Sequence, residues 1–204
     1  MNKISSDAVV YIVDDDAAIR HSLEMLLHSV GHNVKSFASA REFLDSFDSS
    51  IPGCLLLDVR MPEISGLDLQ QILIKDEIKI PVIIITGHGD VPMAVRAMKE
   101  GAVDFIEKPF HDQYLLDSVA KALTKSIEIQ QRQNDQIKFN ERASRLSPRE
   151  RQVMEVLVAG KHTKEIASEL GISPKTVDVH RGHIMEKMQV KSMVELVRLS
   201  MANT

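Results

Sequence analysis

Four runs of apolar residues in the first half of the chain each end at a polar residue with reactive chemistry. Short uninterrupted apolar runs are typical of parallel β-strands that are buried on both faces. The runs are Ala8–Val13 before Asp14, Asp15 and Asp16, Cys54–Leu57 before Asp58, Val82–Ile85 before Thr86, and Val103–Ile106 before Glu107, Lys108 and Pro109. The pattern predicts a buried parallel sheet.

Segments of helical periodicity alternate with these runs. Ala17–Ser29 places its apolar residues on one stripe and stops at Gly31, a residue typical of helix ends. The other expected elements are a strand at Asn33–Phe37 and helices from Ser39 to Phe47, Ser65 to Asp76, Val91 to Glu100 and Asp112 to Lys125. Five strands alternating with five helices predict an α/β domain, a doubly wound parallel sheet in the flavodoxin-like order 2-1-3-4-5.

The carboxyl ends of parallel strands meet at one edge of a sheet, and open α/β sheets bind their ligands there. In this chain that edge would gather three carboxylates, a hydroxyl and a lysine. Such a set is suited to binding a divalent cation and to carrying a phosphoryl group on an aspartate. An Asp-Asp pair after a strand can also be a simple helix start, but four such residues at four strand ends favour a site.

The remainder of the chain changes character twice. Residues 126–145 are rich in Gln, Asn and charge, and their scattered isoleucines do not sustain a heptad, which predicts a solvated helical linker. After it, Ser147 and Glu150 form a capping-box pattern that opens a helix running to Gly160. Further helices are expected from Thr163 to Leu170, from Ser173 to Met188 and from Ser192 onward. A short helix, a tight turn at Gly171 and a longer helix make a helix-turn-helix.

The longer helix of this motif has two unlike faces. Val177, Ile184 and Met188 share one stripe and should pack inward, and the opposite face is neither apolar nor uniformly charged. Alone it would be a solvated face, but the preceding turn and the surrounding basic residues favour DNA, because small residues approach base edges and cations meet phosphates. The expected DNA-binding residues are Lys164, Lys175, Thr176, Asp178, Val179, Arg181, Gly182, His183 and Lys187.

Composition and charge agree with two domains of different character. A chain of 204 residues with 44% hydrophobic residues can form about two compact units. Residues 1–125 hold 12 Lys+Arg against 19 Asp+Glu, whereas residues 126–204 hold 13 against 10, so the second part is the one suited to a polyanion. The single cysteine, Cys54, fits a core position in a reducing compartment. Neither a signal peptide nor a membrane span is recognisable, so we expect a cytoplasmic protein without membrane partners.

Two sets of motifs resemble known families. In the first half they are Thr86–Val95 and Gly101–Phe110, and in the second half Leu146–Arg151, Lys164–Ala167, Ser173–Val177 and Asp178–Arg181. The first 125 residues resemble the receiver domain of bacterial two-component response regulators, most closely the FixJ group. The last part resembles the LuxR-type helix-turn-helix of the FixJ and NarL families. The implied domains are a receiver at 1–125, a linker at 126–145 and a DNA-binding domain at 146–204.

The resemblance implies roles for the residues at the sheet edge. Asp58 is the expected phosphoacceptor, taking a phosphoryl group from a sensor histidine kinase, and Lys108 pairs with the phosphoryl oxygens. Mg²⁺ is the implied cofactor, held by Asp14, Asp15, Asp58 and the carbonyl of Arg60. Asp16 is not in this ligand set and fits an exposed acid at a helix start. The Lys108–Pro109 bond is implied to be cis. No other enzymatic activity is expected.

The resemblance also implies a switch. Thr86 would move to the phosphoryl group, and Phe105, which lacks the hydroxyl that many receivers carry there, would reorient. Dimerisation would follow, with Val95 and Lys99 as candidate contacts, and two C-terminal domains would match two half-sites of promoter DNA. RNA polymerase is a further candidate partner.

Two other functions compete with this interpretation. Asp14 and Asp16 after a strand are similar to the motif of haloacid-dehalogenase-type phosphatases, but Ala18 stands where that motif has Thr or Val, and the helix-turn-helix is left unexplained. A DNA-binding regulator could also use its receiver only as a dimerisation scaffold, independent of phosphorylation. The complete acidic set at the sheet edge argues against this alternative.

Overall fold

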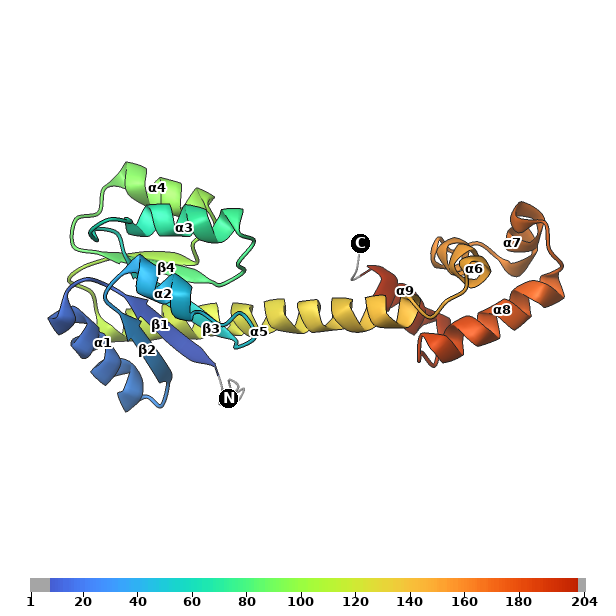
Figure 1. The fold of residues 1–204 in the computed structure, drawn as a ribbon, viewed down its shortest axis with the longest axis horizontal. Helices are drawn as coiled ribbons and strands as arrows, with labels where there is room; N and C mark the ends of the chain where they lie inside the picture. The colour runs from blue at the N-terminus through green and yellow to red at the C-terminus, as the bar shows by residue number, and fades with distance from the viewer. Residues whose placement is uncertain (1–7, 202–204) are drawn as a thin grey trace. The chain divides into compact units, whose positions relative to one another are not determined.

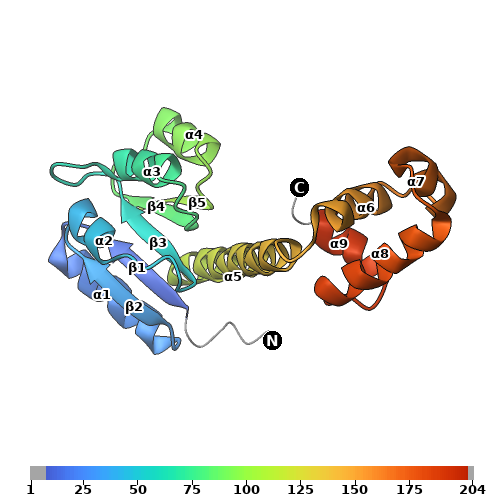
Figure 2. The same cartoon turned by 45° about the vertical axis from the view of Figure 1, so that its right-hand side comes forward.

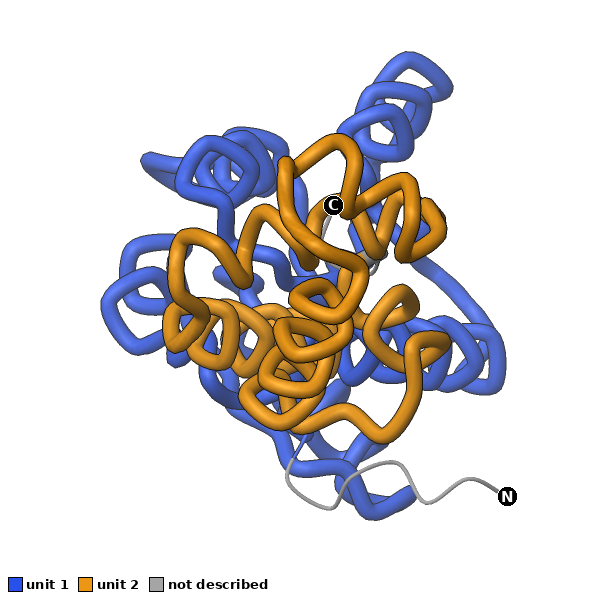
Figure 3. The backbone as a smooth tube through the Cα atoms, turned by 90° about the vertical axis from the view of Figure 1, so that its right-hand side faces the viewer, with its two compact units in different colours: residues 1–130 blue, residues 131–204 orange. Residues whose placement is uncertain are grey.

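A computed structural model describes residues 8–201, which fall into two compact units, residues 1–130 and 131–204 (Figure 3). The limits of the predicted domains at residues 1 and 204 lie outside the described range. The first unit contains β1 (Val9–Val13), α1 (Ala17–Ser29), β2 (Asn33–Phe37), α2 (Ala40–Ser46), β3 (Gly53–Asp58), α3 (Gly66–Lys75), β4 (Val82–Thr86), α4 (Val91–Lys99), β5 (Asp104–Glu107) and the start of α5 (Asp112–Ala143). The second contains α6 (Pro148–Val158), α7 (Thr163–Leu170), α8 (Pro174–Lys187) and α9 (Met193–Met201).

The first unit is built on a five-stranded parallel sheet in the order β2-β1-β3-β4-β5, which confirms the predicted fold (Figure 1). Every residue of β1, β3 and β4 is buried, as the uninterrupted apolar runs predict. The register pairs Val13 with Leu57 and Thr86 with Glu107. The carboxyl ends of β1, β3, β4 and β5 therefore lie at one edge of the sheet.

Helices cover both faces of the sheet and bury the two sides of each strand (Figure 2). Leu55 and Leu57 of β3 pack with residues of α2, α3 and α4. Cys54 and Leu56, which point to the other face, pack with residues of α1 and α5. Full burial of each such leucine stabilises the fold by about 1.5–3 kcal/mol, so the alternation holds β3 firmly in the centre.

A glycine lets α3 begin directly behind the end of β3. Ser65 caps the helix by accepting a hydrogen bond from the Asp68 amide at 3.2 Å. At the next position, Gly66, an added Cβ would lie 2.1 Å from the backbone oxygen of Asp58. Only glycine allows this close approach, so the start of α3 supports the backbone that carries Asp58.

Helix α5 comprises the last helix predicted for the first domain and most of the predicted helical linker. The helix expected at Asp112–Lys125 and the linker expected at 126–145 form one continuous helix to Ala143, because no Pro or Gly interrupts them. Its buried stripe ends at Ser126, whose hydroxyl accepts a hydrogen bond from the Gly53 amide at 2.9 Å.

The second unit is all-helical and has its own core. Val153 and Leu157 of α6 pack with Ile166 of α7 and with Val177 and Ile184 of α8. Gly171 ends α7 with φ of 64°, a left-handed conformation that favours glycine, so the predicted tight turn is confirmed. Within residues 8–201 we find no helix with an apolar stretch of the length that a bilayer requires.

Candidate functional site

Three charged side chains from different strand ends meet at the carboxyl edge of the sheet. Asp14 follows β1, Asp58 ends β3 and Lys108 follows β5. The ammonium of Lys108 donates hydrogen bonds to Asp14 Oδ2 at 2.8 Å and to Asp58 Oδ1 at 3.0 Å. Asp14 and Asp58 are only 3% and 8% exposed, so their charges interact in a site largely shielded from water.

Backbone groups hold both carboxylates in place. Asp14 Oδ1 accepts a hydrogen bond from the Asp16 amide at 2.9 Å, and Asp58 Oδ2 accepts one from the Arg60 amide at 2.6 Å. The guanidinium of Arg20 donates to the carbonyl oxygen of Asp14 at 2.7 Å. This role of Arg20 was not predicted, because the guanidinium reaches the Asp14 carbonyl only when helix α1 is folded.

The site holds two carboxylates and one ammonium, and its electrostatics reflect that imbalance. Burial raises the pKa of Asp58; Lys108 opposes the shift, Asp14 adds to it, and the net pKa lies above the usual range. Burial lowers the pKa of Lys108, but its bonds to Asp14 and Asp58 outweigh burial and leave that pKa raised. Lys108 therefore stays protonated. Asp58 would be stabilised by a further cation in the site or by neutralisation of its charge.

The two acidic residues after Asp14 have different surroundings. Asp16 caps α1 by accepting a hydrogen bond from the Ala18 amide at 2.8 Å, which agrees with an acid at a helix start. Asp15 is exposed beside Asp14. Carboxylate oxygens from Asp14, Asp15 and Asp58 are the hard donors that Mg²⁺ prefers, so the residues present fit this ion.

Thr86 and Lys108 are joined through the backbone. The Lys108 amide donates to the Thr86 carbonyl at 2.8 Å, and Thr86 is 1% exposed at the end of β4. Its hydroxyl accepts a hydrogen bond from the His88 amide at 3.3 Å. The Lys108–Pro109 peptide bond is cis, as the resemblance implies.

Phe105 lies on β5 next to the loop that follows Thr86. Its ring is partly buried, and a Cβ added at Gly89 would lie 2.9 Å from it. On the neighbouring helix α4, Val95 is 46% exposed and Lys99 is exposed. Val91 is also exposed, so α4 presents apolar area to solvent.

The predicted inner and outer faces of α8 are observed. Val177, Ile184 and Met188 are fully buried in the core of the second unit. On the outer side, Val179 is 51% exposed. The other exposed residues of that face are Lys175, Asp178, Arg181, Gly182, His183 and Glu186, and Lys164 of α7 is exposed as well. Thr176 is partly buried, and its hydroxyl lies 2.8 Å from that of Ser173.

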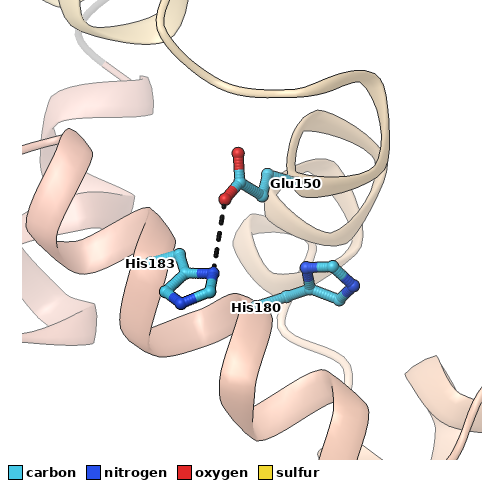
Figure 4. A group of neighbouring side chains, drawn as sticks. All are labelled: Glu150, His180 and His183. Atoms are coloured by element: carbon cyan, nitrogen blue, oxygen red, sulfur yellow. Dashed lines mark ion pairs between the residues drawn. The ribbon is translucent and has the colours of Figure 1, made fainter.

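Two lysines near this face already have acidic partners. Lys187 donates to Glu150 Oε2 at 2.6 Å, and Lys161 donates to Glu169 at 2.6 Å. Glu150 is only 4% exposed and also lies 3.6 Å from His183 Nδ1 (Figure 4). The sequence marked Glu150 as a capping residue; its burial depends on the packing of α6 against α8, which no local pattern reveals.

Comparisons with known proteins divide the chain into two family regions. Residues 10–120 match the response regulator receiver domain, and residues 144–200 match the bacterial regulatory proteins of the luxR family. Together the two matches span most of the chain.

Curated relatives match over nearly the whole chain. Nodulation protein W of Bradyrhizobium diazoefficiens is 47% identical over 96% of this chain and 86% of its own length. The transcriptional regulatory protein FixJ of the same species is 46% identical over 94% of both chains. A solved structure of the response regulator StyR aligns with a TM-score of 0.82 at 43% identity, covering 96% of this chain and 98% of that one.

Proposed function

The chain belongs to the response regulators of two-component systems that join a receiver domain to a LuxR-type DNA-binding domain, and from this premise we propose that phosphorylation of Asp58 controls its binding to DNA. The observation that carries the proposal is the buried Asp58 carboxylate 3.0 Å from the Lys108 ammonium. Its relatives are transcriptional regulators, and this membership leaves the phosphatase alternative without support.

The chemical step transfers a phosphoryl group from a sensor histidine kinase. An Asp58 oxygen attacks the phosphorus of a phosphohistidine, the P–N bond breaks and an acyl phosphate forms. Lys108 then exchanges part of its contact with Asp58 for the phosphoryl oxygens. Hydrolysis of the same acyl phosphate returns the carboxylate, so the only turnover in the proposal is at Asp58 itself.

Mg²⁺ is the proposed cofactor. Asp14, Asp15 and Asp58, with the carbonyl of Arg60, would hold it. When bound, it neutralises charge on the transferring group. The raised pKa of Asp58 supports this role, because a buried carboxylate with an acidic neighbour gains from a second cation.

The proposed switch links the phosphoryl group to a surface. Thr86 hydrogen-bonds a phosphoryl oxygen, the loop after β4 moves and Phe105 reorients against Gly89. This changes the surface of α4, where Val95 and Lys99 contact a second copy of the chain. Val91, 76% exposed, and Met98, 47% exposed, support an apolar contact there.

The proposed output is promoter binding by the dimer. Residues 126–145 connect the receiver, 1–125, with the DNA-binding domain, 146–204. Helix α8 enters the major groove. The proposed DNA-binding residues are Lys164, Lys175, Thr176, Asp178, Val179, Arg181, Gly182 and His183. The partners in this proposal are the kinase, double-stranded promoter DNA and RNA polymerase, all met in the cytoplasm.

Intact-mass measurement tests the chemical step. The chain is incubated with acetyl phosphate and Mg²⁺, with Asp58→Asn as the test variant and Asp117→Asn, an exposed carboxylate on α5, as the matched control. We expect one phosphoryl group on the wild type and the control and none on Asp58→Asn. Equal phosphorylation of Asp58→Asn would refute the assignment.

A further inference from the structure

The second unit contains a capping glutamate that is buried. Glu150 Oε2 accepts a hydrogen bond from the Ser147 amide at 2.7 Å, which completes the capping box of α6. This role needs no burial: Glu165 has the same place in α7, accepts from the His162 amide at 2.7 Å, and is exposed. Glu150 is 4% exposed, so its position serves more than the cap.

Helix α8 places two side chains on this one carboxylate. The Lys187 ammonium donates to Oε2 at 2.6 Å, and His183 Nδ1 lies 3.6 Å from Oε1 (Figure 4). The two residues are four positions apart, which puts them one turn apart on one side of α8. Glu150 therefore contacts the C-terminal half of α8 from the first turn of α6.

The contact is charged and short. The hydrogen bond from Lys187, with that from the Ser147 amide, lowers the pKa of Glu150 to about 2, so the carboxylate is ionised at physiological pH. Charge-assisted hydrogen bonds have stricter geometry than apolar packing. Apolar residues between the helices, such as Val153 and Ile184, pack without directional bonds, whereas this ion pair joins particular atoms of α6 and α8.

Metal binding is a weaker explanation of the same cluster. Ligand-type atoms of Glu150, His180 and His183 lie within 4.8 Å of one another. The Lys187 ammonium, however, already neutralises the carboxylate and would repel an incoming cation. The cluster is better explained by contacts within the protein.

We propose that Glu150 is a positioning residue for DNA binding, which orients α8 through Lys187 and His183. In this assignment Lys187 is a clamp between helices and not a phosphate contact. The inference rests on the DNA-binding role proposed above. The inference thus gives Lys187 a different role from the solvent-exposed lysines of the same domain.

The two roles of Lys187 predict effects of opposite sign. If Lys187 is a clamp, Glu150→Gln keeps the cap but loosens α8, and DNA binding weakens. If Lys187 contacts phosphate, Glu150→Gln frees its ammonium, and DNA binding tightens with a steeper dependence on salt. Glu165→Gln is the matched control, because it removes the same charge from a capping glutamate whose hydrogen bond is to the His162 amide and not to α8.

The full-length wild type first selects a DNA duplex from a random-sequence pool. The experiment then measures the affinity of each protein for this duplex at several salt concentrations. Mg²⁺ and beryllofluoride are present throughout. The variants are Glu150→Gln, Lys187→Gln, their combination and Glu165→Gln. Melting followed by circular dichroism confirms that each is folded at the assay temperature. The double variant leaves no buried charge unpaired. If Lys187→Gln is unfolded at the assay temperature, the double variant still shows how DNA binding changes when the contact between Glu150 and Lys187 is removed.

We expect both single variants to bind about tenfold more weakly than the Glu165→Gln control, with an unchanged salt slope, because α8 would then hold the binding orientation in only about a tenth of the molecules. The double variant should bind no more weakly than either single one, because both remove the same contact. Tighter binding by Glu150→Gln, or a slope reduced by about one in Lys187→Gln, would overturn the inference. If the wild type selects no sequence from the pool, the DNA-binding role itself fails.

Discussion

Asp58→Asn should stabilise the receiver at neutral pH while abolishing its phosphorylation. Asp58 is 8% exposed and shares Lys108 with Asp14, so one of two buried carboxylates lacks full compensation. Lys108 donates to Asp58 Oδ1 and the Arg60 amide to Oδ2, so the single amide oxygen of asparagine can keep one of these two hydrogen bonds, and Lys108 keeps Asp14. The substitution thus removes a repulsion and gives up one hydrogen bond.

The magnitude follows from the balance of charges and hydrogen bonds at the site. Replacing a poorly compensated buried charge by a neutral residue of similar shape stabilises a fold by about 1–4 kcal/mol, and the lost hydrogen bond costs about 1 kcal/mol, so a gain of about 1 kcal/mol in the free energy of unfolding is expected at pH 7. For a domain of this size the melting temperature should rise by about 4 °C. Because folding raises this pKa, the wild type's Asp58 destabilises the fold only when ionised. The gain of the variant should therefore appear as the pH rises from about 4 through the pKa of Asp58 and persist above it.

Thermal unfolding of the full chain measures this gain at pH 7 and near pH 4. The receiver transition is identified by its rise on addition of Mg²⁺, the cofactor proposed for the folded wild type. Asp117→Asn, which removes an exposed carboxylate of α5, serves as the control and should leave the transition unchanged. A lower melting temperature for Asp58→Asn at pH 7, or an equal gain at both pH values, would refute the reasoning.

Three further substitutions test other contacts. Lys108→Met should destabilise the receiver by about 2–4 kcal/mol in urea unfolding at pH 7, since it leaves two buried carboxylates unpaired; an unchanged midpoint would contradict this. Gly66→Ala should destabilise it by about 3 kcal/mol or more in the same assay, because its Cβ would meet the Asp58 backbone; a fully stable variant would show that α3 can shift freely. Ser147→Ala should lower the stability of the second unit by about 1 kcal/mol through loss of the α6 cap, and no change in its melting would exclude that role.

The fold was predictable because its main signals are local. The signals are apolar runs on buried strands, the capping box of Ser147 and the glycine at Gly171; each acts on its own segment, and the structure confirms them. The meeting of Asp14, Asp58 and Lys108 was predictable as well, because parallel strands of similar length bring their ends to one edge.

What escaped prediction depends on packing between distant segments. Arg20 reaches the carbonyl of Asp14 only when α1 is folded, and Glu150 is buried only when α8 lies on α6. In α5, by contrast, the change from apolar to polar residues near Ser126 marks a change of neighbours along a helix that continues, in agreement with the predicted helical linker. Burial of a polar residue is set by the tertiary fold, and a periodic pattern cannot encode it.

The most direct test of the central claim is the affinity for the selected DNA duplex with and without beryllofluoride and Mg²⁺, for the wild type and for Asp58→Asn. We expect the wild type to bind more tightly and to sediment as a dimer when beryllofluoride is present, and Asp58→Asn to show neither response. Equal DNA binding by both proteins in every condition would contradict control by Asp58 and would leave the receiver as a phosphorylation-independent scaffold.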